Sequence, residues 1–156
     1  MGRVYTVTFE QVAVSVLQDL WSVQVPADIM LIVHGFEIFQ TSDVQDAEEE
    51  ILRIRVKRQT GSFTVGSGGA AGTNVRAQEG DAAALVTSRT NDTTQATGTF
   101  ETVDIVGWNV RIPQPKIWVP ETQMTIRASS DLVIDLPEGP VDSLDINATL
   151  TFEEIG

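Results

Sequence analysis

A glycine-rich tract is the first feature of the sequence whose residue types could do chemistry. It places Gly66, Gly68, Gly69 and Gly72 directly after a strand-like segment. Such loops can cradle phosphates, but the nucleotide-binding form ends in Gly-Lys followed by Ser or Thr, whereas Thr73 follows Gly72. A dinucleotide site would also need a helix immediately after the glycines. The tract therefore predicts a flexible loop that contacts a partner chain, not a nucleotide site.

Catalytic side chains are scarce. His34 is the single histidine, so a site with several histidines is excluded, while a mixed histidine and carboxylate metal site stays open. A serine triad would have to use His34, and the chain has no Gly-x-Ser-x-Gly motif. Cysteine is absent, which excludes disulfides, thiolate metal sites and cysteine catalysis. Glu37, between Phe36 and Ile38, is best explained as an outward strand residue. We expect no enzyme, no cofactor, no metal and no small-molecule substrate.

An acidic run at residues 43–50 could suggest calcium binding. It contains Asp43, Asp46 and three consecutive glutamates that end at Glu50. Calcium loops need oxygen ligands at alternate positions and a central glycine, and both are missing here. We expect a solvated turn, with a charged contact between subunits as the alternative, because a basic segment follows directly.

Two tryptophans flank the sequence Ile112-Pro-Gln-Pro115. If they are exposed, Trp108 and Trp118 could stack on sugar rings or on a partner chain. If they are buried, they pack in the core or under the proline turn. The exposure of these two rings therefore decides whether a carbohydrate-binding module remains a sound alternative.

A basic strand is the remaining feature with functional potential. Its outward positions hold Arg53, Arg55 and Lys57, and the alternating residues Leu52, Ile54 and Val56 are apolar. In an acidic chain these cations form a local patch of opposite sign that could contact a partner. Alternatively, they protect an exposed edge strand from unwanted pairing.

The elements that carry these residues read as strands because apolar residues recur with period two. Residues 5–9 and 12–16 alternate with opposite parity, so a bulge is predicted at Glu10–Gln11. The same switch within residues 31–38 predicts a second bulge at His34–Gly35. Strands that bend midway suit a curved sheet, a sandwich or a barrel.

Further strands are predicted along the rest of the chain, and turn residues separate them. They are expected at residues 100–112, 116–119, 124–127, 132–136 and 144–152. Short helices are expected over Asp43–Glu50 and over Glu79–Arg89, the second capped by Asp81. The tract 59–77 is expected to be one long glycine-rich loop. The whole chain, residues 1–156, is predicted to be a single all-β domain: an antiparallel β-sandwich, jelly-roll-like, with eight or nine strands.

Composition narrows the possible partners. The formal net charge of −12 disfavours nucleic acid, whose phosphate backbone is bound by clustered Lys and Arg. The first ten residues lack the charged and then apolar pattern of a secretory signal. The longest apolar runs are only a few residues long, so no membrane span is expected.

Four stretches also resemble a known family. They are MGRVYTVTFEQVAV at the start, TSDVQDAEEEILRIRVKR with the glycine-rich loop after it, WVPET at Trp118–Thr122, and PVDSLDINATLTFEEIG at the end. They are similar to small proteins encoded in tailed-phage and prophage genomes, in particular to head decoration, or cement, proteins. The resemblance covers nearly the whole chain.

The resemblance implies a β-rich, often jelly-roll protein that sits as a homotrimer on the outer surface of the capsid. Such a protein, made in the bacterial cytoplasm, binds the major capsid protein noncovalently and stabilises the shell. The family contributes no catalytic residues. The basic strand and the four glycines of the tract are the expected contact residues. A tail or connector component remains an alternative within the same class.

Overall fold

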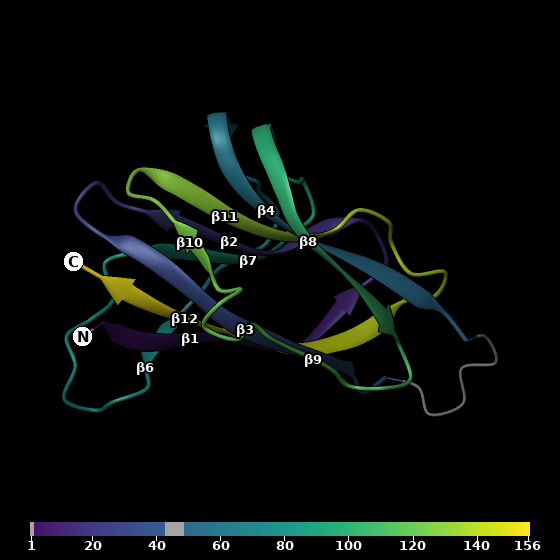
Figure 1. The fold of residues 1–156 in the computed structure, drawn as a ribbon. Coiled ribbons are helices and arrows are strands. Elements are labelled where there is room, and N and C mark those ends of the chain that lie inside the picture. Colours follow the sequence, from purple (N-terminus) through teal and green to yellow (C-terminus); the bar gives the residue numbers. More distant parts are fainter. Residues whose placement is uncertain (1, 43–48) are drawn as a thin grey trace.

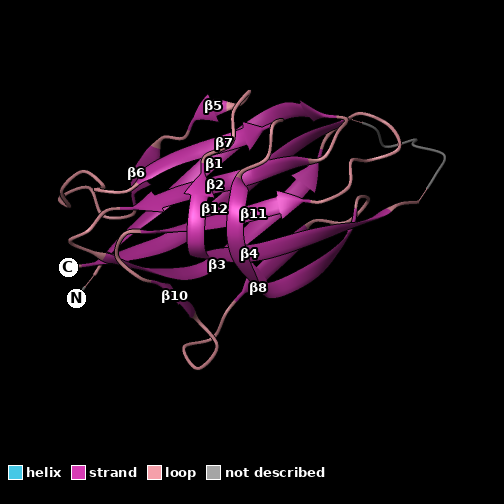
Figure 2. Cartoon of the chain, turned by 90° about the horizontal axis from the view of Figure 1, so that it is seen from above, coloured by secondary structure: helices cyan, strands magenta, loops and turns pink. Residues whose placement is uncertain are grey.

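The computed structural model describes residues 2–42 and 49–156. The described chain is all-β, and its strands form two antiparallel six-stranded sheets packed face to face (Figures 1 and 2). Sheet A has the strand order β10-β3-β12-β1-β6, with β9 also paired to β3. Sheet B has the order β5-β7-β2-β11-β4-β8. The predicted antiparallel β-sandwich is confirmed.

The described residues form twelve strands, against the eight or nine expected, and eight of these strands have six or more residues. The strands are β1 (Arg3–Val14), β2 (Gln18–Val25), β3 (Met30–Gln40), β4 (Ile51–Thr64), β5 (Ala70–Ala71), β6 (Asn74–Arg76), β7 (Thr87–Asp92), β8 (Thr97–Asn109), β9 (Gln114–Ile117), β10 (Met124–Ile126), β11 (Ser130–Leu136) and β12 (Leu144–Ile155).

Both predicted bulges are confirmed. The register between β1 and β12 shifts between Phe9 and Val12, and Gln11 takes a positive φ of 50°. Because the bulge adds one residue to β1, Val12 pairs with Ile146 and Val14 pairs with Leu144. The apolar side chains on both sides of the bulge therefore face the core. In β3 the register shifts between Val33 and Gly35. Glycine is needed there because a Cβ would collide with the carbonyl oxygen of Lys116 on β9.

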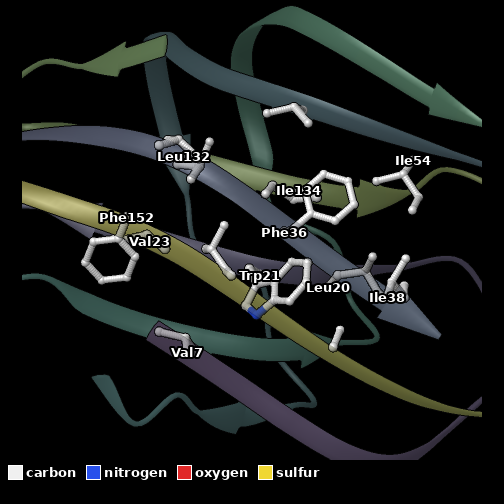
Figure 3. Close-up of a cluster of buried hydrophobic side chains, with 14 of the residues drawn as sticks. Val7, Leu20, Trp21, Val23, Phe36, Ile38, Ile54, Leu132, Ile134 and Phe152 are labelled. Atoms are coloured by element: carbon white, nitrogen blue, oxygen red, sulfur yellow. The ribbon is translucent and has the colours of Figure 1, made fainter. Parts of the chain in front are cut away.

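The core lies between the two sheets and is continuous. Trp21 of β2 occupies its centre, with ring centroids 5.3 Å from Phe9 and 5.9 Å from Phe36 (Figure 3). The inward residues of β12, β3 and β11 complete it and are buried. Burial of this many large apolar side chains is the main stabilising term of the fold. The core therefore fixes both sheets as rigid supports for the residues on their outer faces.

Two local expectations are wrong. No helix forms over Glu79–Arg89, because its last residues belong to β7, which pairs with β2 and β5. Sheet pairing in the folded chain thus overrides the local helix preference. The expected loop over 59–77 is also broken up, since β4 extends to Thr64 and two short strands lie within the tract. The acidic residues from Asp43 to Glu48, and with them most of the first expected helix, lie outside the described residues.

Candidate functional site: the outer face of sheet B

The basic strand is not an edge strand. β4 lies between β11 and β8 in sheet B, so the interpretation that its cations protect an edge is wrong. The three predicted apolar residues face the core, and Arg53 and Arg55 face outward, as expected. The side chain of Lys57 also points away from the core, but the residue is only 8% exposed. Something must therefore cover this end of the strand and neutralise its charge.

Asp135 of β11 provides that neutralisation. Its side chain is 0% exposed and receives bonds from two cations of the neighbouring strand. Arg55 binds it in a bidentate manner, with Nε–Oδ1 at 3.0 Å and one terminal nitrogen 2.7 Å from Oδ2. The Nζ of Lys57 also lies 2.7 Å from Oδ2. These charge-assisted bonds satisfy a carboxylate that would otherwise be costly to bury.

Two loop segments, residues 65–69 and 93–96, cover this ionic cluster. The end of β4 and the start of β8 rise together from the sheet (Figure 1), and the two loops continue from them. The loops join each other through a bridge between Ser67 and Thr94. The backbone N–H of Ala96 donates to the Oδ2 of Asp19 at 2.6 Å, and the amide of Gln95 donates to Asp135 at 3.3 Å. These two segments, residues 65–69 and 93–96, are called the cover below. Hydrogen bonds to buried carboxylates attach the cover to β2 and β11.

Asp92 of β7 holds the glycine-containing segment of the cover, residues 65–69. Its Oδ1 accepts a bond from the backbone N–H of Gly69 at 3.0 Å, and Arg89 binds both carboxylate oxygens. The hydrogen bond with this carboxylate raises the pKa of Arg89, against the opposing effect of burial. Arg89 is therefore a fourth cation on the outer face of sheet B, and the charge pattern of the sequence did not single it out.

The predicted contact glycines have a packing role that the sequence did not suggest. A Cβ at Gly66 would lie 2.5 Å from the carbonyl oxygen of Thr94 and 3.1 Å from the Oδ2 of Asp19. A Cβ at Gly69 would collide with the carbonyl oxygen of Thr90, and Gly68 has a positive φ of 90°. A Cβ at Gly72 would lie 3.0 Å from side-chain atoms of Val7 on β1 and Ser88 on β7. The tract therefore lies tightly against sheet B, and its contact with a partner stays a prediction.

Burial changes the acidity of two carboxyl groups on this sheet. Desolvation raises the pKa of Asp19 to about 6, although the bond from Ala96 and the charge of Lys57 oppose the change. The other oxygen of Asp19, Oδ1, is buried without a hydrogen-bond partner. Desolvation likewise raises the pKa of Asp131 to about 6. Both groups favour the protonated form more than a solvent-exposed aspartate does.

A strip beside the ionic cluster remains open to solvent. We define the β4–β8 strip as Ile51, Arg53, Ile105 and Gly107, which lie on the outward side of two paired strands. Ile51 is 73% exposed and Ile105 is 58% exposed. Only the Cγ2 of Ile51, at 3.8 Å, lies within 4 Å of the Cβ position of Gly107, so the surface beside this glycine is otherwise open. In the described residues β8 pairs only with β4, and its other side is an open edge.

The two tryptophans are buried. Trp108 is 0% exposed and donates from its Nε1 to the carbonyl oxygen of Ile112 at 3.1 Å. Trp118 is 6% exposed and donates to the Oδ2 of Asp104 at 2.9 Å. Although burial raises the pKa of Asp104, bonds from Lys116 and Trp118 lower it overall. Neither ring is available to stack on a sugar, so the carbohydrate-binding alternative loses the surface on which it depended.

The histidine lies on the outer face of sheet A. The Nε2 of His34 is 3.1 Å from the Oε2 of Glu153, and its Nδ1 is 2.9 Å from the amide nitrogen of Gln123. An open groove of about 400 Å³ next to it is lined by His34, Glu37 and Lys116 among others. Glu37 is exposed on the outward side of β3, as predicted. No nucleophile is hydrogen-bonded to the ring in the described structure, since both ring nitrogens contact other groups.

Searches for relatives identify no family. A comparison with protein-family models gave no match, and searches of curated proteins and of solved structures gave none at a significant level. Within the described residues, no cluster of three or more His, Asp or Glu side chains is arranged to hold a metal ion. None of the described segments forms a helix with the length and apolarity to cross a membrane.

Proposed function

We propose that the protein is a virion structural protein of a tailed phage, a capsid decoration protein that stabilises the head through noncovalent contacts with the major capsid protein. The observation that carries the proposal is the β4–β8 strip together with the open edge of β8. It presents large apolar side chains and a cation on the surface of a chain with a net charge of −12. Exposed apolar residues beside an unpaired strand edge are typical of contacts between protein chains.

The rest of the structure is consistent with a scaffold. A rigid two-sheet core supports the strip, and its outer loops are attached through buried carboxylates. The resemblance noted in the sequence adds the specific class. In this proposal the fold belongs to the jelly-roll type, the protein forms a homotrimer, and the strip is the surface through which chains meet. Trimerisation would multiply weak contacts with the shell through effective concentration.

The first test is the molar mass in solution by light scattering coupled to size exclusion. The proposal expects a mass of about 51 kDa, three times the 17.0 kDa of one chain. Ile105→Asp places a charge in the strip and should reduce the mass to that of the monomer. Leu85→Asp, at a residue that is 56% exposed in the loop before β7, is the matched control and should leave the trimer intact.

The second test is cosedimentation with expanded phage heads that lack their decoration protein. The wild-type chain should pellet with the heads at a fixed ratio, and Ile105→Asp should stay in the supernatant. A monomer that does not bind the heads would overturn the proposal. A trimer that binds equally well with Ile105→Asp would retain the class of protein but move the contact away from the strip.

A further inference from the structure

A pocket of about 270 Å³ lies where the two sheets meet at one edge of the sandwich. One wall comes from the β4–β8 pair and includes Arg58, Thr60 and Glu101. The other comes from β10, the turn after it and the start of β11, and includes Thr125, Arg127 and Ser130. The pocket is thus held between elements of different sheets, and it is separate from the β4–β8 strip and from the groove at His34.

The charges in this pocket are unbalanced. Arg58 uses two nitrogens on a single oxygen of Glu101, with Nε at 2.8 Å and a terminal nitrogen at 2.7 Å from Oε2. Arg127 is exposed, and its side chain makes no hydrogen bond or ion pair with any described residue. Two arginines and one glutamate leave the pocket with a net charge of +1, in a chain whose total is −12.

This surplus charge specifies the class of ligand. A single carboxylate would neutralise the pocket, whereas a doubly charged phosphate would leave an uncompensated negative charge near Glu101. A guanidinium presents parallel N–H donors that match the two oxygens of a carboxylate. Arg58 already holds one carboxylate oxygen inside the pocket, the Oε2 of Glu101. The volume suits one small acid or one acidic side chain.

We propose that this pocket binds a carboxylate group, with Arg127 as the primary contact and Arg58 as the secondary one. The carboxylate can belong to a free monocarboxylic acid or to a glutamate side chain of a partner protein. This inference does not depend on the proposed function, because it concerns different residues, at the end of β4 and the start of β8.

The experiment measures binding of two probes at low ionic strength by NMR titration of the arginine Nε–H signals. The probes are butyrate and a tetraglutamate peptide, with inorganic phosphate as the competing anion. Saturable shifts at Arg127 with either carboxylate probe support the proposal. Similar affinities for both indicate a free acid, and an affinity at least tenfold higher for the peptide indicates a protein partner.

Two substitutions with opposite expected effects make the test specific. Arg127→Gln should weaken binding at least tenfold, because it removes the free guanidinium. Glu101→Gln should tighten binding several-fold, because it releases Arg58 and raises the net charge of the pocket from +1 to +2. Arg53→Gln removes another exposed arginine of β4, paired with Glu138, and is the matched control that should leave the affinity unchanged.

Three results would overturn the proposal. They are the absence of saturable binding, an equal loss of affinity in Arg53→Gln and Arg127→Gln, and tighter binding of phosphate than of either carboxylate. Circular dichroism of each variant verifies that the fold is kept. Because Arg127 is exposed and unpaired in the described structure, its replacement is not expected to unfold the chain.

Discussion

The four cations of β4 divide into two groups that the sequence does not distinguish. Arg55 and Lys57 converge on Asp135, which is 0% exposed. Arg53 and Arg58 pair with Glu138 and Glu101, whose side chains are 72% and 54% exposed. Every pair has an N–O distance of 3.0 Å or less, so geometry alone does not separate the groups. The difference lies in the cover over sheet B, which shields the pairs of Asp135 from water, and not in the charge pattern of the strand. Buried and exposed pairs are expected to contribute differently to stability.

The largest expected effect comes from removing one carboxylate from each group of ion pairs. Asp135→Ala leaves two cations without their buried partner and should lower the free energy of unfolding by about 3–5 kcal/mol. Glu138→Ala removes an exposed partner of Arg53 and should cost less than about 1 kcal/mol. Urea denaturation of both variants measures the difference. Equal losses would show that the cover does not isolate the cluster from water.

The next largest effect is a dependence of stability on pH. Asp19 and Asp131 have pKa values of about 6 in the folded chain, above those of about 3.9 expected when unfolded. The folded state therefore binds more protons between these values, and stability falls as the pH rises from about 4 to about 6. Each group contributes a loss of up to about 3 kcal/mol, since contact with water reduces the effect.

Substitution separates these contributions in chemical denaturation measured across pH. Asp19→Asn should remove about half of the decline between pH 4 and pH 6, because Asp131 keeps its share. Asp104→Asn is the matched control, since the pKa of Asp104 is lowered and its contribution is lost only at more acidic pH. A decline that stays the same in Asp19→Asn would assign the pH dependence to other groups.

The smallest expected effect comes from a glycine substitution in the cover, compared with one in an open loop. Gly69→Ala adds a methyl group against the carbonyl oxygen of Thr90 and should destabilise the chain by about 1–3 kcal/mol. At Gly80 nothing lies within 4 Å of a Cβ, so Gly80→Ala should leave stability unchanged or raise it by about 0.4–1 kcal/mol. Thermal unfolding of the pair measures both. A mild effect at Gly69 would mean that the cover shifts easily.

Period-two patterns in the sequence predicted the long strands that have one wet face, together with both bulges. β12 and the first half of β4 alternate clearly, because only their inner faces lie in the core. β2 was missed because seven of its eight residues are buried, which removes the alternation. β7 was missed because its sequence TSRTND is polar, and its place comes only from pairing with β2 and β5.

The candidate site was less predictable than the fold. The sequence identified the basic strand and the glycine tract, but not the aspartates that organise them. Asp19, Asp92 and Asp135 lie far apart in the chain and come together only when β2, β7 and β11 enter sheet B. No local pattern marks an aspartate as buried. Whether an aspartate is buried depends on which residues the folded chain places next to it, and the local sequence does not contain this information.

The position of β12 has a consequence for how the chain is made. This strand is the last one in the sequence, yet it lies in the interior of sheet A, between β3 and β1. During synthesis β1 and β3 leave the ribosome long before the strand that joins them. Pairing over such separations is intrinsically slow. Sheet A therefore closes only after translation of residues 144–155. Until then β1 can pair only with β6, and β3 only with β9 and β10, so each keeps one open edge that favours aggregation.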